Sequence, residues 1–308
     1  MTSINVLIMT IKRITNAIYI RLLKVDFIRN IIYKRFTSKY TYRIKDSFDT
    51  VDLIINQKVS VARYGDGELD MIWGVGNGFQ SYDRNLAKRL NEILISNNDR
   101  LVIGVPHTLI SCDEYVDQAQ LYAQLYVCMN YKRILSTIPI NKEFINTNFS
   151  RFYMSMKDKS NCGLMIKKIC KIWENKSVLL VEGTSTRFGV GNNLLSNVIS
   201  VRRILCPSVN AFSKYDIILN SIKNIATNDD IIILALGMTA TVLAADLALL
   251  GYHAIDIGHL DVEYEWYLMQ SHEKCALKNK AVNEVGIQVV NEDIDDIDYV
   301  KSIICRID

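Results

Sequence analysis

The stretch "IIILALGMTATVLAADLALLGYHAIDI", residues 231–257, decides the fold. It opens on an apolar run of strand length, Ile231–Leu236, and closes on a second one, Ala254–Ile257. Between the two runs, Thr241–Leu250 has the length and pattern of a helix. A strand, a helix and a second strand in this order predict two parallel strands joined by a crossover helix.

The same alternation extends over most of the chain. Four more buried strands are predicted at Val59–Ala62, Leu101–Val105, Val178–Val181 and Ile204–Cys206. Four more helices are predicted at Arg84–Ile95, Glu114–Met129, Gly163–Trp173 and Ala211–Ile225. We therefore expect an α/β, Rossmann-like fold, with a mostly parallel sheet flanked by helices. Ligands of such sheets bind outside the carboxyl ends of the strands, so the site is expected there.

Composition narrows the class of protein. A chain of 308 residues that is 49% apolar can bury a substantial core. Its seven cysteines form no CxxC pair, which argues against a disulfide framework or a zinc knuckle. No segment resembles a cleaved signal, so a cytoplasmic location is expected.

Charge is distributed unevenly along the chain. The net charge is +3, yet residues 1–45 hold ten Lys or Arg and one Asp, a balance of +9. The rest carries 26 basic and 32 acidic residues, a balance of −6. A nucleic-acid-binding body needs positive charge on its folded surface, so we expect no nucleic acid as a partner.

The N-terminal segment predicts a basic amphipathic helix, and we place a boundary between residues 1–45 and a domain at 46–308. Its apolar stripe consists of Ile4, Leu7, Ile11, Ile14, Ile18, Leu22, Val25 and Ile32, with Arg29 inside it. No run of 18 uncharged apolar residues exists here, so the segment is not a transmembrane helix. Residues 1–35 either lie on an anionic membrane, at its inner face, or pack on the body or on another subunit.

The stretch "VARYGDGELD", residues 61–70, follows the first predicted strand of the body. If Arg63–Glu68 is an extended loop, Asp66 and Glu68 project to the same side and can share one divalent cation. Arg63 can bind a phosphate as a planar fork. The alternative is an acidic turn in which Asp66 caps the following helix.

Two further loops follow predicted strands. After Gly237, Thr239 or Thr241 begins a helix, which favours an anion at its free N–H groups; the alternative is an ordinary capped helix. In "EGTSTRFGVGNNLL", residues 182–195, Arg187, Asn192 and Asn193 suit a nucleotide or sugar; the alternative is a polar surface loop. No GxGxxG spacing is complete, so a nicotinamide fingerprint is absent.

The stretch "DIGHLDVEYEW", residues 256–266, follows the last predicted strand and places carboxylates beside His259. Any of these carboxylates could act as a base or complete a metal shell. One histidine among carboxylates is a poor zinc site, and the alternative for His259 is a hydrogen-bonded loop residue.

Taken in order, these segments resemble the bacterial glycosyltransferases of the GT-D fold. The matching strings are "ARYGDGELD", "TRFGVGNNLL", "CPSVNAFSKYDIIL", "ALGMTATVLAADLALLGYHAIDIGHLDVEYEW" and "KNKAVNEV". The resemblance spans roughly residues 60–285 and leaves the N-terminal 45 residues outside. It departs from the family pattern at Met238, where Pro is expected, and at Asn193, where Asp is expected.

The resemblance implies a transferase that moves a sugar from a nucleotide donor, a UDP-hexose, to a growing surface polysaccharide or glycoprotein glycan, with a lipid-linked acceptor as one option. It implies Mn²⁺ or Mg²⁺ bound by Asp66 and Glu68, and it makes Glu263 and Asp261 the leading candidates for the base. The implied nucleotide-sugar-binding residues are Arg63, Tyr64, Gly65, Asp66, Arg187, Asn192, Asn210, Thr239 and Thr241. An inverting or a retaining mechanism stays open.

Two other functions use the same features. A metal-dependent phosphohydrolase, or another nucleotide-handling enzyme, would use the carboxylate pair with water as the nucleophile. A peripheral membrane or assembly protein would keep the Rossmann-like body only as a scaffold.

Overall fold

The computed structural model describes residues 18–290 and 296–308, which form two compact units. The smaller unit contains the chain up to Arg43 together with His107–Lys142. The larger unit contains Ile44–Pro106 and Glu143–Asp308 and includes every predicted site residue. In the described ranges, no helix combines the length and apolarity needed to cross a membrane.

The smaller unit is built on two helices, α2 (Asp26–Lys39) and α6 (Asp117–Thr137), with a 3-10 turn at His107–Leu109. Arg29 of α2 is 5% exposed and donates from Nε to the Gln124 side chain of α6 at 3.0 Å. Tyr33 donates to the backbone oxygen of Thr108 at 2.6 Å. The charge inside the predicted apolar stripe is therefore buried and paired within this unit.

The continuous helix expected over Ile4–Ile32 is interrupted. The helical turns that precede α2 end before a bend at Lys24 and Val25, and α2 begins after it. The first four members of the stripe, Ile4 to Ile14, lie outside the described residues. The boundary at residue 45 stays a prediction, and the described chain adds 107–142 to the N-terminal unit.

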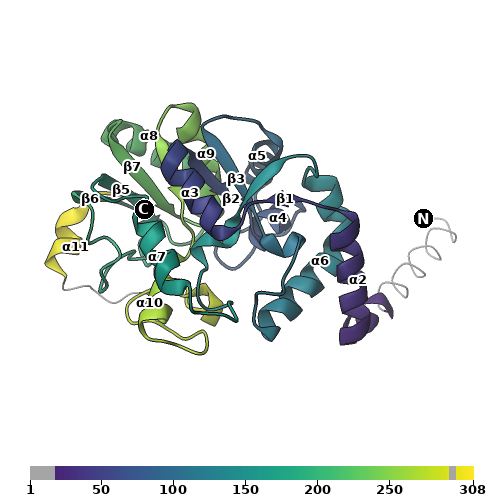
Figure 1. Cartoon of the computed structure of the whole chain (residues 1–308). Helices are drawn as coiled ribbons and strands as arrows, with labels where there is room; N and C mark the ends of the chain where they lie inside the picture. Colours follow the sequence, from purple (N-terminus) through teal and green to yellow (C-terminus); the bar gives the residue numbers. More distant parts are fainter. Residues whose placement is uncertain (1–17, 291–295) are drawn as a thin grey trace. The chain divides into compact units, whose positions relative to one another are not determined.

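The larger unit contains a sheet in the order β1-β4-β3-β2-β8-β7-β5-β6-β9, and every pairing among β2 to β9 is parallel (Figure 1). The strands are β1 (Arg43–Ile44), β2 (Ser60–Arg63), β3 (Leu101–Val105), β4 (Glu143–Asn146), β5 (Ser177–Gly183), β6 (Ser200–Cys206), β7 (Asp230–Ala235), β8 (His253–Asp256) and β9 (Ile303–Arg306). The predicted parallel α/β fold and all six predicted strands are confirmed; β1, β4 and β9 were not predicted.

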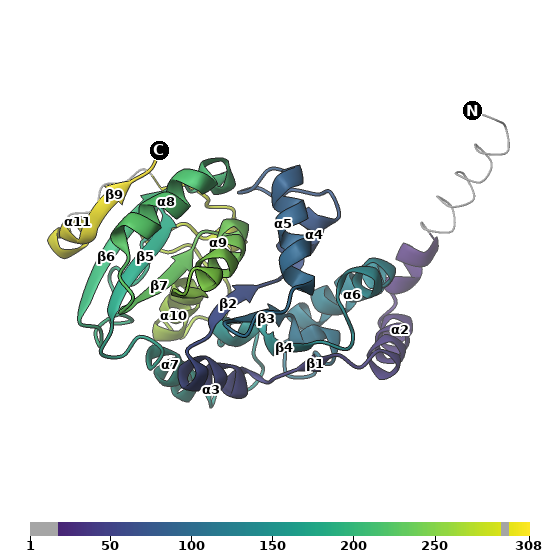
Figure 2. The same ribbon diagram turned by 90° about the horizontal axis from the view of Figure 1, so that it is seen from above.

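Helices cover both faces of this sheet (Figure 2). The helices of this unit are α3 (Ser47–Gln57), α4 (Asp66–Ile72), α5 (Arg84–Ile95), α7 (Cys162–Cys170), α8 (Tyr215–Ile225), α9 (Met238–Leu249), α10 (Leu260–Leu268) and α11 (Ile297–Ser302), with 3-10 turns at Thr147–Ser150, Ala211–Lys214 and Asn283–Val285. The predicted helix 211–225 is thus split into a 3-10 turn and α8, and α9 begins three residues earlier than expected.

The apolar runs reflect this layering. In β5, Val178 and Leu180 face the core formed with α3, α7 and α10, while Leu179 and Val181 face the core formed with α8 and α9. Strands buried on both faces need apolar side chains at consecutive positions, which is why the runs do not alternate. The carboxyl ends of these strands meet at one edge of the sheet.

Candidate active site

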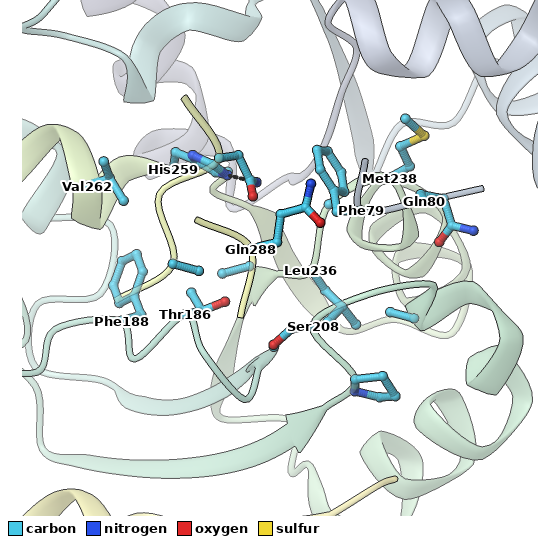
Figure 3. Close-up of a pocket in the computed structure, with 18 of the residues that line it drawn as sticks. Phe79, Gln80, Thr186, Phe188, Ser208, Leu236, Met238, His259, Val262 and Gln288 are labelled. Atoms are coloured by element: carbon cyan, nitrogen blue, oxygen red, sulfur yellow. Dashed lines mark hydrogen bonds between the residues drawn. The ribbon is translucent and has the colours of Figure 1, made fainter. Parts of the chain in front are cut away.

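A cavity lies at the carboxyl ends of β8, β7, β5 and β6 (Figure 3). Its floor includes Gly258, Gly237, Gly183 and Ser208, each from the end of one of these strands or the residues that follow. The remaining wall is supplied by Phe79, Gln80, Met238, His259, Asn283 and Gln288, among others. This is the position in which parallel α/β sheets bind ligands.

Phe79 forms one wall of the cavity beside the start of α9. Gly237 has φ +54°, and a Cβ added there would lie 2.9 Å from the Phe79 ring, so a side chain would displace the ring. Asn210 holds the Phe79 segment: its amide N–H donates to the Phe79 oxygen at 2.8 Å, and its side-chain oxygen accepts from Ser81 N at 2.7 Å. Asn210, named above for nucleotide-sugar binding, thus positions a cavity wall.

The acidic pair after β2 adopts a different local structure from the one expected. Asp66 and Glu68 lie in the first turn of α4, not in an extended loop, with Gly65 as the N-cap. Glu68 turns back and accepts a hydrogen bond from Gly65 N at 2.8 Å, so Glu68, rather than Asp66, satisfies the free N–H of the cap. In a helix, residues two apart do not project to the same side, so the geometric reason given for a shared cation is wrong.

The charges around Glu68 are nevertheless suited to a cation. Burial, with smaller contributions from the charges of Asp256 and Asp66, raises the pKa of Glu68 to about 7 against the opposing hydrogen bond from Gly65. Burial also raises the pKa of Asp256, against the opposing charge of Arg63. Asp256 is buried, Glu68 is half-buried and Asp66 is exposed, and carboxylates that repel one another in this way fit a hard divalent ion. In the part of the chain that the structure describes, no group of three or more His, Cys, Asp or Glu could hold a metal, so a cation on this pair would need water or phosphate oxygens as its other ligands.

Arg63 lies behind the cavity floor. Its Nε donates to Thr147 O at 2.9 Å, and its Nη1 lies 3.7 Å from Asp256 Oδ1. The guanidinium packs on Gly258, where an added Cβ would lie 1.7 Å from Nη1. Tyr64 is fully buried, and its hydroxyl donates to Leu90 O at 2.7 Å, so its side chain belongs to the core.

The two threonines of α9 differ in their surroundings. Thr241 Oγ1 lies 3.0 Å from Arg63 O and 3.1 Å from Asp256 Oδ2, so it holds the strand ends together. Thr239 is 1% exposed, and its hydroxyl has no hydrogen-bond partner among the described residues. A buried hydroxyl without a partner is unusual, but Thr239 is not among the residues that line the cavity, so its role in ligand binding stays a prediction.

The loop after β5 is tied to α10 by a buried cluster. Asp261 Oδ1 accepts from Gly189 N at 2.8 Å and from Asn192 Nδ2 at 2.9 Å. Its Oδ2 pairs with Lys280 Nζ at 2.6 Å, and Lys280 also bonds Glu265 at 2.9 Å. Asp261 lines the cavity, but both of its oxygens have partners.

Arg187 and Glu263 are likewise engaged by the protein. Arg187 donates to the backbone oxygen of Asn279 at 2.9 Å. Glu263 is 1% exposed and accepts from the N–H groups of Tyr153 and Met154 at 3.2 and 2.9 Å. Burial raises the pKa of Glu263, against the charge of Arg151 and these hydrogen bonds. The catalytic role expected for Glu263 and Asp261 stays a prediction.

Comparison with known proteins identifies the family. The family model described as "Glycosyltransferase GT-D fold" matches residues 61–285. The chain belongs to this family of glycosyltransferases. It is 35% identical over 262 residues to the probable glycosyl transferase Gly of Streptococcus gordonii, covering 84% of this chain and 38% of that protein. It is 33% identical over 268 residues to the glycosyltransferase GlyD of Streptococcus pneumoniae, covering 86% of this chain and 32% of that protein.

The GT-D chain thus spans about a third of the length of these two relatives. A solved structure of the domain of unknown function 1792, described as a distinct glycosyltransferase fold, superposes with a TM-score of 0.84 at 33% identity, covering 90% of this chain and 99% of its own. A glycosyltransferase of the same domain from Streptococcus sanguinis gives 0.83 at 32% identity, covering 87% and 100%. These matches establish the GT-D fold and the family of this chain.

Sequence reasoning did not assign a role to several residues of this GT-D cavity. Phe79, Ser208 and Asn283 line it, as does Gln288. Ser208 lies within "CPSVNAFSKYDIIL" and Asn283 within "KNKAVNEV", whereas Phe79 and Gln288 lie outside the strings quoted above. Ser208 and Asn283 thus lie in strings that carry the family resemblance, yet a lone polar residue in a loop does not by itself indicate a ligand.

Proposed function

We propose that this chain transfers a hexose from a UDP donor to a hydroxyl of a growing glycan. The observation that carries the proposal is the cavity at the carboxyl ends of β8, β7, β5 and β6, which combines the N-terminus of α9 with the aromatic wall of Phe79. Free N–H groups and the helix dipole favour a diphosphate at α9, and the Thr239 hydroxyl can add a donor. The flat ring of Phe79 suits stacking with a base.

The proposed cofactor is Mn²⁺ or Mg²⁺, held by Asp66 and Glu68. Both residues supply carboxylate oxygens, which these hard cations prefer, and Glu68 retains one oxygen that makes no bond to Gly65. When bound, the ion would offset the charge that develops on the departing diphosphate. Arg63 would add positive charge behind the cavity floor.

A donor screen tests the proposal. Purified protein with Mn²⁺ is given a panel of nucleotide sugars, and release of free nucleoside diphosphate is followed with and without EDTA. We expect one UDP-sugar to be consumed by the wild type, and consumption to fall at least 100-fold in Asp66→Asn and in Glu68→Gln. Asp99→Asn, which changes an exposed aspartate outside the site, is the matched control and keeps the wild-type rate.

The products separate the alternatives. Free UDP together with free sugar or a glycoside supports the transferase. Inorganic phosphate as the product would instead support the phosphohydrolase. A protein that neither binds UDP in calorimetry nor consumes any donor would leave the scaffold function.

We also propose that the N-terminal unit lies on an anionic membrane, at the cytoplasmic face, where a lipid-linked acceptor would be presented. On α2, Phe27 and Ile31 are 73% and 51% exposed and lie four residues apart, on one side of the helix. Lys24, Lys34 and nearby arginines add positive charge, each worth about 1 kcal/mol at an anionic surface.

Flotation with vesicles tests this membrane contact. The wild type should float with vesicles containing phosphatidylglycerol and not with pure phosphatidylcholine. Phe27→Glu with Ile31→Glu should abolish flotation, whereas Ile217→Glu, at an exposed position of α8, should not. Equal flotation of all three proteins would argue against the contact.

A further inference from the structure

His259 lines the cavity, and the hydrogen-bond partners of its ring nitrogens are those expected for a catalytic general base. It follows Gly258 at the end of β8, is the N-cap residue of α10, and its side chain is 28% exposed. Its ring lies in the cavity wall (Figure 3), and Asn283 also lines the cavity. Both ring nitrogens have partners: Nδ1 lies 3.2 Å from the Glu284 carboxylate, and Nε2 lies 3.2 Å from Asn283 Nδ2.

These partners determine which nitrogen carries the proton. The amide nitrogen of Asn283 can only donate, so Nε2 accepts, and Nδ1–H donates to Glu284. Glu284 is itself held as a carboxylate by Arg151, whose Nη1 lies 2.7 Å from Oε1. Although burial opposes ionisation, the bonds from His259 and Arg151 keep the pKa of Glu284 well below its ordinary value. The lone pair of Nε2 is thus directed to the side of the ring where Asn283 lines the cavity.

The Glu284–His259 pair has the arrangement of the carboxylate and histidine in a hydrolytic catalytic triad. In such a triad the carboxylate fixes the tautomer of the imidazole and stabilises the imidazolium that forms. The carboxylates of α10 are placed differently. Asp261 pairs with Lys280 and accepts two further N–H bonds, and Glu263 is turned toward the backbone of Tyr153 and Met154. Asp261 and His259 both line the cavity, but they differ in how their basic atoms are engaged. Both oxygens of Asp261 bond groups of the loop after β5 or Lys280, whereas Nε2 of His259 contacts Asn283, which itself lines the cavity.

We propose that His259 is the general base of the transfer reaction, with Glu284 as its positioning residue. The proposal rests on the proposed sugar transfer. The acceptor hydroxyl displaces the Asn283 amide and gives its proton to Nε2, while its oxygen bonds to C1 of the donor sugar. The bond from C1 to the β-phosphate oxygen breaks, and its electron pair leaves with UDP. The imidazolium, paired with Glu284, then loses its proton to solvent. A single displacement of this kind inverts the configuration at C1.

The test uses the full chain, Mn²⁺ and the donor that the screen selects. His259→Ala should lower donor turnover about 10²- to 10⁴-fold, the usual contribution of general base catalysis, while the affinity for UDP in calorimetry stays within threefold of wild type. Free imidazole should restore turnover to His259→Ala. His272→Ala, which changes an exposed histidine, is the control, and its turnover should equal that of the wild type with and without imidazole. Glu284→Gln should lose turnover without rescue by imidazole, because the base is present but wrongly oriented.

Each outcome has a meaning. Rescue of His259→Ala with an inverted product, assigned by the NMR coupling at C1, supports the proposal. Retained turnover in His259→Ala, loss that imidazole does not reverse, or a product of retained configuration overturns it. If turnover in His259→Gln equals wild type while Asp261→Asn abolishes it, the base is Asp261. A wild type that turns over no donor refutes the proposed function itself, which is a separate result.

Discussion

Replacing Lys280 by Met tests whether the cluster beneath the cavity is held by its buried ion pair. Lys280 is 4% exposed, and its ammonium lies 2.6 Å from Asp261 and 2.9 Å from Glu265. Met has a similar length and no charge. The substitution therefore leaves Asp261, itself 3% exposed, as a buried carboxylate without a cation.

The expected cost follows from this geometry. Removing one partner of a buried pair destabilises proteins by about 3–5 kcal/mol, because the other charge remains buried and uncompensated. Asp261 keeps its hydrogen bonds from Gly189 and Asn192, so we expect the lower end, about 3 kcal/mol. Asp261→Asn in the same chain removes the charge, and the double variant should recover at least half of the loss.

Urea unfolding at pH 7, followed by tryptophan fluorescence, gives the four free energies of the cycle, and the slope with urea shows whether the folded state is intact. A loss below about 1 kcal/mol in Lys280→Met, or a double variant no more stable than the single, would refute the reasoning. The folded double variant also separates two roles of Asp261. Donor turnover near wild type indicates a structural role, whereas a folded but inactive protein indicates that Asp261 is the base.

Four further substitutions have defined outcomes. Burial lowers the pKa of His253 to about 4 from 6.5, so its contribution to stability is complete above pH 6.5 and is lost as the pH falls toward 4. Between pH 7 and pH 4 the free energy of unfolding of the wild type should fall by about 3 kcal/mol more than that of His253→Gln, as measured by urea titrations. The same pH dependence of stability in both proteins would contradict the lowered pKa. Gly258→Ala, at φ +58°, must displace the Arg63 guanidinium; we expect UDP affinity to fall at least tenfold, and wild-type affinity would show that Arg63 is not needed. Thr241→Val should cost about 1–3 kcal/mol because Asp256 and Arg63 O lose a shared donor. Thr239→Val should lower the free energy of unfolding by under about 0.5 kcal/mol yet weaken UDP binding. If Thr239→Val instead destabilised the fold more than Thr241→Val and left UDP affinity unchanged, the ligand role of Thr239 would be refuted.

The sequence by itself determined the layers of this protein. Runs such as Ile231–Leu236 are apolar at every position, which only strands covered on both faces require, and the helical segments between them set the parallel direction. The position of the site followed from the same pattern, because the carboxyl ends of parallel strands share one edge. The ordered motifs indicated the GT-D family, which the family model confirmed over residues 61–285. Strand β4 was missed because only Phe144 and Ile145 are apolar in it, which is too short a run to indicate a buried strand, and β9 was missed as well.

Only the tertiary structure decided what each side chain in those motifs contacts. The sequence predicted a loop at Asp66 and Glu68. In the structure Gly65 is the N-cap of a helix, and the Glu68 carboxylate accepts a hydrogen bond from Gly65 N. Glu263 finds its partners at Tyr153 and Met154, about 110 residues away, and His259 finds Glu284 in a separate segment. Periodicity records which face of an element is buried, and that is a local property of the chain. Which polar groups then meet depends on long-range packing, since a buried carboxylate or imidazole takes whichever partners the folded chain brings within hydrogen-bond distance.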